Sequence, residues 1–144
     1  MPAYASLEDL TRRYGLQRLI DLTDRADPPA GEIDAAAVAA ALDAASSLID
    51  GYLRPVIALP LAAVPAQLRQ AAEAIALYRL SGDELDRDGK TAADHREALA
   101  WLRDVADGRA VLGVGAAEAP AAPARTVKMA GPARVFDRGA MKVF

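Results

Sequence analysis

The sequence has no cysteine, and among its 144 residues it has one histidine, one tryptophan and two phenylalanines. The absence of cysteine excludes a disulfide framework and thiolate metal sites, and it fits a reducing compartment. Aromatic residues make up only 5% of the chain, while alanine dominates its apolar content. We therefore expect a thin core built from helices rather than a thick sheet sandwich.

A long uncharged segment is also missing. The longest stretch without a charged residue, 55–68, holds three prolines and is too short to span a bilayer. No basic segment followed by an apolar one opens the chain. These features predict a soluble intracellular domain with no membrane partner.

The net charge of −3 is unevenly distributed along the chain. Residues 125–144 contain five Lys or Arg and one Asp, which leaves 12 basic and 19 acidic side chains in the rest. The body is therefore acidic and the tail basic. An acidic body argues against non-specific binding to DNA, because affinity for phosphates comes from clustered cations.

The composition changes near residue 115, where a stretch that is almost entirely Ala, Pro and Gly begins and continues to residue 124. Residues 1–114 are long enough to build one domain with a modest core. We therefore predict a helical domain over residues 1–114, followed over residues 115–144 by a linker and a partner-binding tail.

Apolar residues spaced by three and four predict four main helices in the domain. The expected bounds are 6–15, 34–53, 65–81 and from about residue 90 to Gly108, with a short helical piece at 16–22. Ser6 with Asp9 forms an expected capping box, and Asp34 is the expected N-cap of the second main helix. The fold class is all-α, a small bundle of about four main helices with an extended C-terminal tail.

The connections carry their own expectations. Pro55 is expected to end the second main helix by pushing Arg54 out of the α region. Residues 56–64 are expected to cross to the next helix as extended chain, and Pro65 to be the first residue of that helix. Residues 109–114 are expected either to form a small strand or to lie extended against the bundle.

Each helix has one apolar face that should be buried. The residues on these faces are Leu7, Leu10 and Tyr14; Val38, Ala41, Leu42, Ala45, Ile49 and Tyr52; Leu68, Ala72, Ile75 and Leu80; and Ala98, Trp101, Leu102 and Val105. The second main helix is also rich in alanine on its other sides. That richness reflects either a general bias of composition toward alanine or a surface on which subunits pack.

We find no catalytic constellation in the sequence, and we expect no enzymatic activity, cofactor or metal. His95 has no second histidine or cysteine to join it, so we interpret it as a solvated surface residue. Residues 84–89 resemble the start of a calcium loop, but His95 stands where the loop needs a bidentate Glu, which favours a simple turn. The carboxylates of Glu8, Asp9 and Glu73 have no evident partner that would shift a pKa.

The tail combines spaced cations with both phenylalanines of the chain. Most chain termini are solubilising ends without a partner. Exposure of Phe136 and Phe144 to water is unfavourable, which indicates a segment that folds onto an acidic or grooved partner. The residues expected to contact that partner are Arg125, Lys128, Arg134, Phe136, Arg138 and Phe144.

Several short motifs follow one another in a set order. They are Tyr4-Ala5, Leu22-Thr23-Asp24, Ile49-Asp50-Gly51-Tyr52-Leu53, Leu59-Pro60-Leu61, Val64-Pro65, Tyr78-Arg79-Leu80 and Ala98-Leu99-Ala100-Trp101-Leu102. In this order and spacing the chain resembles the Mu-like head–tail adaptor proteins of tailed bacteriophages. It departs from their pattern where Pro55 rather than a tyrosine follows Arg54, and near His95, where an aromatic residue is usual.

The resemblance implies an α-helical subunit of a homo-oligomeric ring, expected to contain about twelve copies. Such a ring would lie beneath the portal protein, contact neck, stopper or tail proteins, and let duplex DNA pass without specific binding. It would act at the head–tail junction of the virion, after assembly in the cytoplasm of the bacterial host. The residues alone also allow a small regulatory module, DNA-binding or antitoxin-like, that uses its tail. A steep salt dependence of binding to duplex DNA would distinguish that module.

Overall fold

The computed structural model describes residues 3–82 and 89–113. These residues form five helices: α1 (Leu7–Tyr14), α2 (Leu16–Thr23), α3 (Ala35–Leu53), α4 (Ala66–Ser81) and α5 (Lys90–Ala106). The described part of the chain contains no strand. The predicted all-α class is therefore confirmed, and residues 109–113 lie outside regular structure, with Leu112 buried against the bundle.

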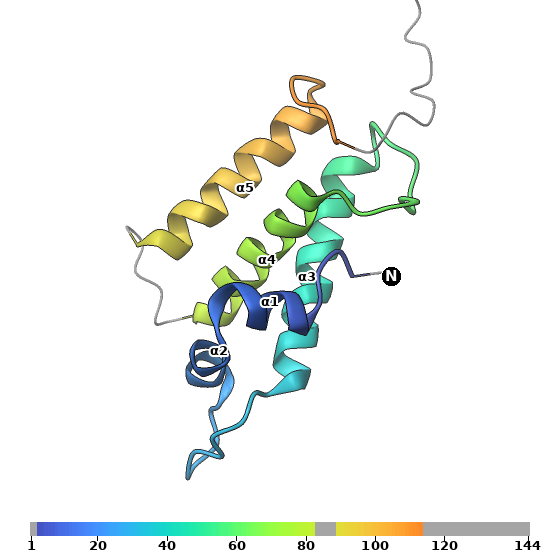
Figure 1. Ribbon diagram of the computed structural model, residues 1–144. Coiled ribbons are helices and arrows are strands. Elements are labelled where there is room, and N and C mark those ends of the chain that lie inside the picture. The colour runs from blue at the N-terminus through green and yellow to red at the C-terminus, as the bar shows by residue number, and fades with distance from the viewer. Residues whose placement is uncertain (1–2, 83–88, 114–144) are drawn as a thin grey trace, which may run out of the picture.

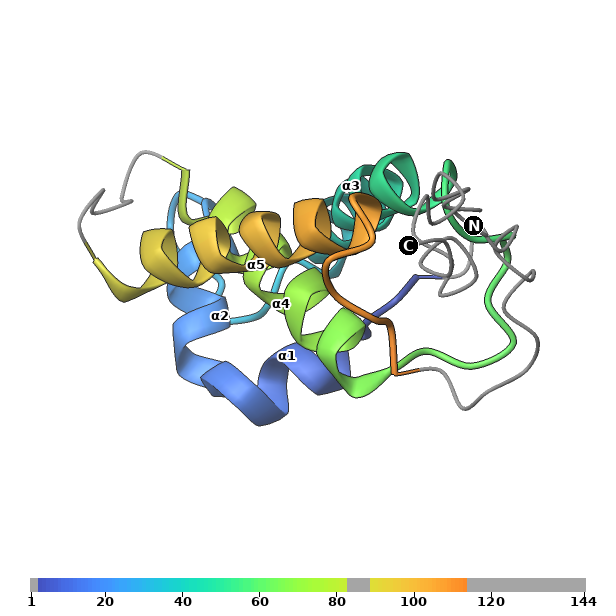
Figure 2. The same cartoon turned by 90° about the horizontal axis from the view of Figure 1, so that it is seen from above.

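The three long helices form the body of the domain (Figure 1). Helix α4 packs against both α3 and α5, while the short helices α1 and α2 follow each other closely and both contact α4 (Figure 2). Because four other helices surround it, α4 is buried along most of its length. All residues from Ala71 to Leu77 are buried.

This burial differs from the single buried stripe predicted for α4. The four stripe residues are buried as expected. The intervening residues are buried too, because alanines at 71, 74 and 76 let neighbouring helices approach α4 from several sides. Glu73 is the one charged residue in the buried run.

The predicted helix caps are confirmed. The backbone N–H of Asp9 donates to Ser6 Oγ at 3.2 Å, and the backbone N–H of Ser6 donates to Asp9 Oδ2 at 3.0 Å, which completes a capping box. Asp34 accepts hydrogen bonds from the backbone N–H groups of Ala36 and Ala37 at 2.9 and 3.1 Å. Gly15 has φ of +87°, which lets the chain end α1 and enter α2 at once.

The connection between α3 and α4 differs from the extended chain that was expected. Arg54 stays in the right-handed α region (φ −51°, ψ −36°) although a proline follows it. The backbone N–H groups of Val56 and Ile57 both donate to the carbonyl of Leu53 at 2.9 Å, so the chain turns there. Pro65 is the N-cap of α4 rather than its first residue.

Three aromatic side chains expected in the core are only half-buried. They are Tyr14 on α1, Tyr52 on α3 and Trp101 on α5. In α3 the buried face continues to Leu53 instead, and it includes the polar residues Ser46 and Asp50. All three rings pack against the core with one side and leave the other accessible.

Helix α3 has a further property that the sequence reasoning missed. It is the one helix among residues 3–82 and 89–113 that is long and apolar enough to cross a membrane by length and composition. The core helix of a bundle passes the same test, and one face of α3 supplies much of this core. We therefore assign its apolar character to packing within the domain.

Candidate partner-binding surfaces

All six residues predicted to bind a partner lie outside the described residues. Arg125, Lys128, Arg134, Phe136, Arg138 and Phe144 follow residue 113. Most of the calcium-like segment, residues 84–88, also falls outside. The surfaces of the helical domain are therefore the ones whose geometry can be built from the residues upward.

A groove of about 220 Å³ lies between α4 and α5, and we call it the α4–α5 groove. It is lined by Arg13, Gln67, Gln70, Ala71, Ala74, Asp94, Glu97, Ala98 and Trp101. Three of these residues are buried alanines, whose short side chains leave the space open. The groove thus has an apolar floor, the indole of the single tryptophan as one wall, and carboxylates and amides on its rim.

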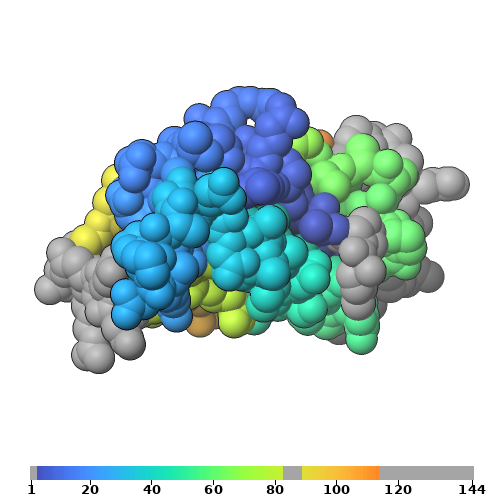
Figure 3. Space-filling view, turned by 90° about the horizontal axis from the view of Figure 1, so that it is seen from below, coloured from blue at the N-terminus to red at the C-terminus, as the bar shows by residue number. Residues whose placement is uncertain are grey.

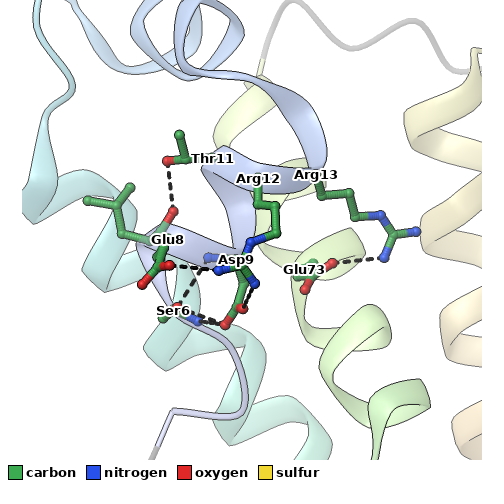
Figure 4. A network of polar contacts seen from close by, with 8 residues as sticks. Ser6, Glu8, Asp9, Thr11, Arg12, Arg13 and Glu73 are labelled. Atoms are coloured by element: carbon green, nitrogen blue, oxygen red, sulfur yellow. Dashed lines mark hydrogen bonds and ion pairs between the residues drawn. The ribbon is translucent and has the colours of Figure 1, made fainter.

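One residue that lines this groove, Arg13, belongs to an ion pair. Arg13 Nη1 of α1 lies 2.8 Å from Glu73 Oε2 of α4, as Figure 4 shows. Glu73 is only 5% exposed, and the arginine compensates its buried charge. Glu73 thus has a charged partner, which the sequence did not reveal.

The carboxylates of α1 also have partners, contrary to expectation. The Ser6 hydroxyl donates to Asp9 Oδ2 at 2.7 Å, and this bond, followed by the one from the Ser6 backbone N–H, lowers the pKa of Asp9. Glu8 pairs with Arg12 at 2.6 Å on the exposed side of the helix (Figure 4). These contacts stabilise the first turn of α1 and suggest no acid–base chemistry.

A buried polar cluster holds the N-terminal segment on α3. The Tyr4 hydroxyl donates to Asp50 Oδ1, and the Tyr4 backbone N–H donates to Ser46 Oγ at 3.2 Å. All three residues are buried. Burial first, and then the carboxylate of Asp50, raises the pKa of Tyr4 far above its ordinary value. The one signal in the sequence was the placement of Ser46 and Asp50, four residues apart on the apolar face of α3.

His95 is not the solvated surface residue that was expected. Its ring stacks on Tyr78 with ring centroids 3.8 Å apart and an interplanar angle of 9°, which joins α5 to α4. The side chain is half-buried. Burial, and then the charge of Arg79, lowers the pKa of His95. In the described part of the chain no group of three or more His, Asp or Glu residues could hold a metal ion.

The outer side of α3 is lined by small residues. The exposed residues there are Ala36, Ala39, Ala40, Asp43, Ser47 and Gly51. Figure 3 looks onto the molecule from this side, where α3 lies beside the N-terminal segment. A second, wider groove of about 580 Å³ runs between that segment, α1 and α3. Such a face lets another helix approach closely.

With this architecture established, comparison with known proteins identifies the relatives of the chain. Residues 4–130 match the family described as Bacteriophage Mu, Gp36. The chain belongs to the bacteriophage Mu Gp36 family. It is 36% identical over 111 residues to Gene product J of Escherichia phage Mu, covering 77% of each chain. It is also 35% identical over 114 residues to the Mu-like prophage FluMu protein gp36 of Haemophilus influenzae, covering 79% of this chain and 78% of the relative.

The Gp36 match confirms the resemblance to Mu-like phage proteins that the order of motifs indicated. It spans the whole described domain and reaches Arg125 and Lys128 of the predicted tail site. Arg134, Phe136 and the later tail residues lie beyond it. The family assignment therefore rests on the helical domain, and the chain is a phage-type protein.

Proposed function

We propose that this Gp36-family protein is a structural adaptor. Copies pack side by side in a ring beneath the portal of a phage or phage-like particle, and the ring joins the capsid to the neck or tail. The observation that carries this proposal is the outer side of α3, a long helix whose exposed residues are small except for Asp43. Membership of a phage protein family supplies the context.

The packing of α3 explains why such a surface suits a repeated contact. Small side chains let helix axes come within about 8–10 Å of each other. Each alanine buries little area, so a stable contact must extend along the helix, and α3 has 19 residues for that purpose. If this face packs against a different surface of the next copy, the contact is heterologous and generates a ring when the rotation closes.

The charge distribution supports the same role. Outside residues 125–144 the chain carries 12 basic and 19 acidic side chains. A channel wall of this sign would let duplex DNA slide past without adhering, since binding to phosphates requires clustered cations. The basic tail then suits a protein partner, either the portal or an adjacent subunit.

Electron microscopy of the full-length protein, alone and mixed with the portal protein, tests the proposal. Rings that cap the portal would support it. Binding to duplex DNA with a steep dependence on salt would instead favour the small regulatory module.

A further inference from the structure

We propose that the α4–α5 groove binds the tail segment 134–138 of a neighbouring copy, with Phe136 seated on the alanine floor. The inference rests on the proposed function in one respect, because it requires two copies side by side. It goes further by naming the site, the segment and the contacts. Four features of the chain carry it: the size of the groove, its charge, the spacing of the tail residues, and the length of chain before them.

The groove has the size of one side chain. Pockets for small ligands usually measure about 300–1,000 Å³, whereas the α4–α5 groove measures about 220 Å³. Its floor consists of Ala71, Ala74 and Ala98, all of them buried. A phenyl ring on this floor would lie against the indole of Trp101, a pairing that aromatic rings favour.

The charge of the α4–α5 groove suits a basic segment better than that of the groove beside α1, which is lined by Arg12, Arg13 and Arg69 against Asp9 and Glu73. The groove beside the α2–α3 loop also has more carboxylates than arginines, so charge alone does not separate it from the α4–α5 groove. In the α4–α5 groove the only arginine, Arg13, is already paired with Glu73.

The carboxylates of α5 complete this argument. Asp94 and Glu97 both line the α4–α5 groove. Asp94 forms an ion pair with Lys90 at 2.8 Å, and Glu97 is exposed. With Asp94 paired to Lys90, Glu97 supplies the net negative charge that the rim presents to the tail, whose residues 125–144 contain five basic side chains and one acidic one. Attraction of this kind fixes both orientation and register.

The spacing of the tail residues matches the spacing of the groove residues. Arg134, Phe136 and Arg138 recur at every second position. In an extended segment they share one side and span about 13 Å, while Asp137 points away.

On α5 the two carboxylates, Ala98 and Trp101 share one face, and Asp94 and Trp101 are separated by about 10 Å along the axis. One arginine thus reaches the carboxylates while Phe136 covers Ala98. The other arginine lies over the indole of Trp101, where a cation is attracted by the ring. The pattern Arg-x-Phe-x-Arg is symmetric, so the match holds for either direction of the segment.

The length of chain before the segment points to a neighbouring copy. In Figure 2 the orange segment that follows α5 ends beside the start of α4, the part of that helix from which Gln67 lines the groove. Roughly twenty residues separate the end of that segment, residue 113, from Arg134, and a chain of that length can span up to about 70 Å. Far fewer linking residues would be needed for the segment 134–138 to reach the groove of its own copy. A tail that enters the groove of the next copy makes a heterologous contact, which generates a ring when the rotation closes.

Photo-cross-linking of the full-length protein tests the inference. One preparation carries p-benzoylphenylalanine in place of Gln67 on the rim of the groove, and it is mixed with a nitrogen-15-labelled unmodified preparation. Mass spectrometry should find cross-links from position 67 to the labelled segment 134–138. Phe136→Ala in the labelled copy should reduce their yield by about tenfold, as expected for a central aromatic anchor. The same probe in place of Gln17, which is exposed on α2, should give none.

A second readout avoids the bulky probe. Trp101 is the only tryptophan, so its quenching by acrylamide reports on the groove of the otherwise unmodified full-length protein. Phe136→Ala and Glu97→Arg should each raise the quenching constant about twofold or more, since water gains access to a ring that the segment had covered. Glu32→Arg, a reversal at an exposed loop position, should leave it unchanged.

The outcomes separate this inference from the proposed function. Rings that cap the portal but show no cross-link from the groove to residues 134–138, or cross-links within one copy only, overturn the inference and leave the adaptor role standing. Cross-links between copies in a protein that forms no ring and binds no portal overturn the adaptor role alone. Quenching that is unchanged by Phe136→Ala also contradicts the inference.

Discussion

Arg13 on α1 and Glu73 on α4 form a 2.8 Å ion pair that joins the two helices, although the residues are 60 positions apart in the sequence. Glu73 is 5% exposed, whereas the side chain of Arg13 is 36% exposed. The partly exposed guanidinium of Arg13 therefore holds the buried carboxylate of Glu73 in place. The pair also sets the position of α1 along the side of the α4–α5 groove.

Glu73→Gln is expected to destabilise the domain. The substitution removes the negative charge that pairs with Arg13 and leaves at most a weaker hydrogen bond to the amide. The free energy of unfolding should fall by about 1–2 kcal/mol, after allowance for the exposure of the arginine. Urea unfolding measures the change. Glu8→Gln breaks the exposed pair with Arg12 and should cost less than about 0.5 kcal/mol. Equal effects of the two substitutions would contradict the assigned importance of the buried pair.

Tyr4→Phe is expected to destabilise the domain, although it removes only one hydroxyl group. Removing one hydroxyl leaves Asp50, which is 7% exposed, without its donor, and a buried carboxylate that loses a hydrogen bond costs about 1–3 kcal/mol. The matched control is Tyr14→Phe, at a half-buried tyrosine with no side-chain hydrogen bond within the described residues. If thermal unfolding shifts equally for both variants, the Tyr4–Asp50 bond contributes little.

The stacked pair Tyr78–His95 predicts a dependence of stability on pH. Because the pKa of His95 is lower in the folded chain than in the unfolded chain, the unfolded state binds more protons as the pH falls below about 6.5. The stability that the neutral ring contributes is complete above that pH and is lost as the pH falls through the lowered pKa of the folded state. Asp9 and Asp24, whose pKa values are lowered, stay ionised in this window.

His95→Phe isolates this effect, since it keeps an aromatic ring and removes the titration. Urea midpoints at about pH 7 and pH 5 should fall less for the variant than for the wild-type protein. Parallel changes in the two proteins would show that His95 is not responsible.

The outer side of α3 can be tested by a single charged side chain. Ala40→Arg places a long cation in the row of small residues and should prevent subunits from packing there, while the monomer stays folded because Ala40 is exposed. Ala100→Arg makes the same change at an exposed position of α5. Light scattering should show smaller assemblies for the first variant alone, and equal masses would mean that α3 is not the packing face.

The features that the sequence predicted depend on neighbours along the chain. Ser6, Asp9 and Asp34 cap helices through residues two or three positions away, so their spacing was sufficient. The same holds for the buried faces of α3 and α5. The helical order and the family resemblance follow from such local patterns, which is why the described domain agrees with them.

The missed features depend on distant partners or on small side chains. Tyr4 contacts Asp50 across 46 residues, and the polar residues Ser46 and Asp50 on the apolar face of α3 do not indicate which distant residue they bind. Alanine fits both buried and exposed helix positions, so the sequence did not show that every residue from 71 to 77 is buried. The groove exists because alanines on two helices face each other, and only the packing of those helices reveals it.

We propose that copies of this chain form a ring at the portal, and electron microscopy of the full-length protein mixed with purified portal distinguishes such a ring from separate subunits. We predict closed rings with a central channel, seated on one end of the portal, that are lost with Ala40→Arg and retained with Ala100→Arg. Single copies that neither form rings nor bind the portal, at concentrations where the domain is folded, would contradict the claim.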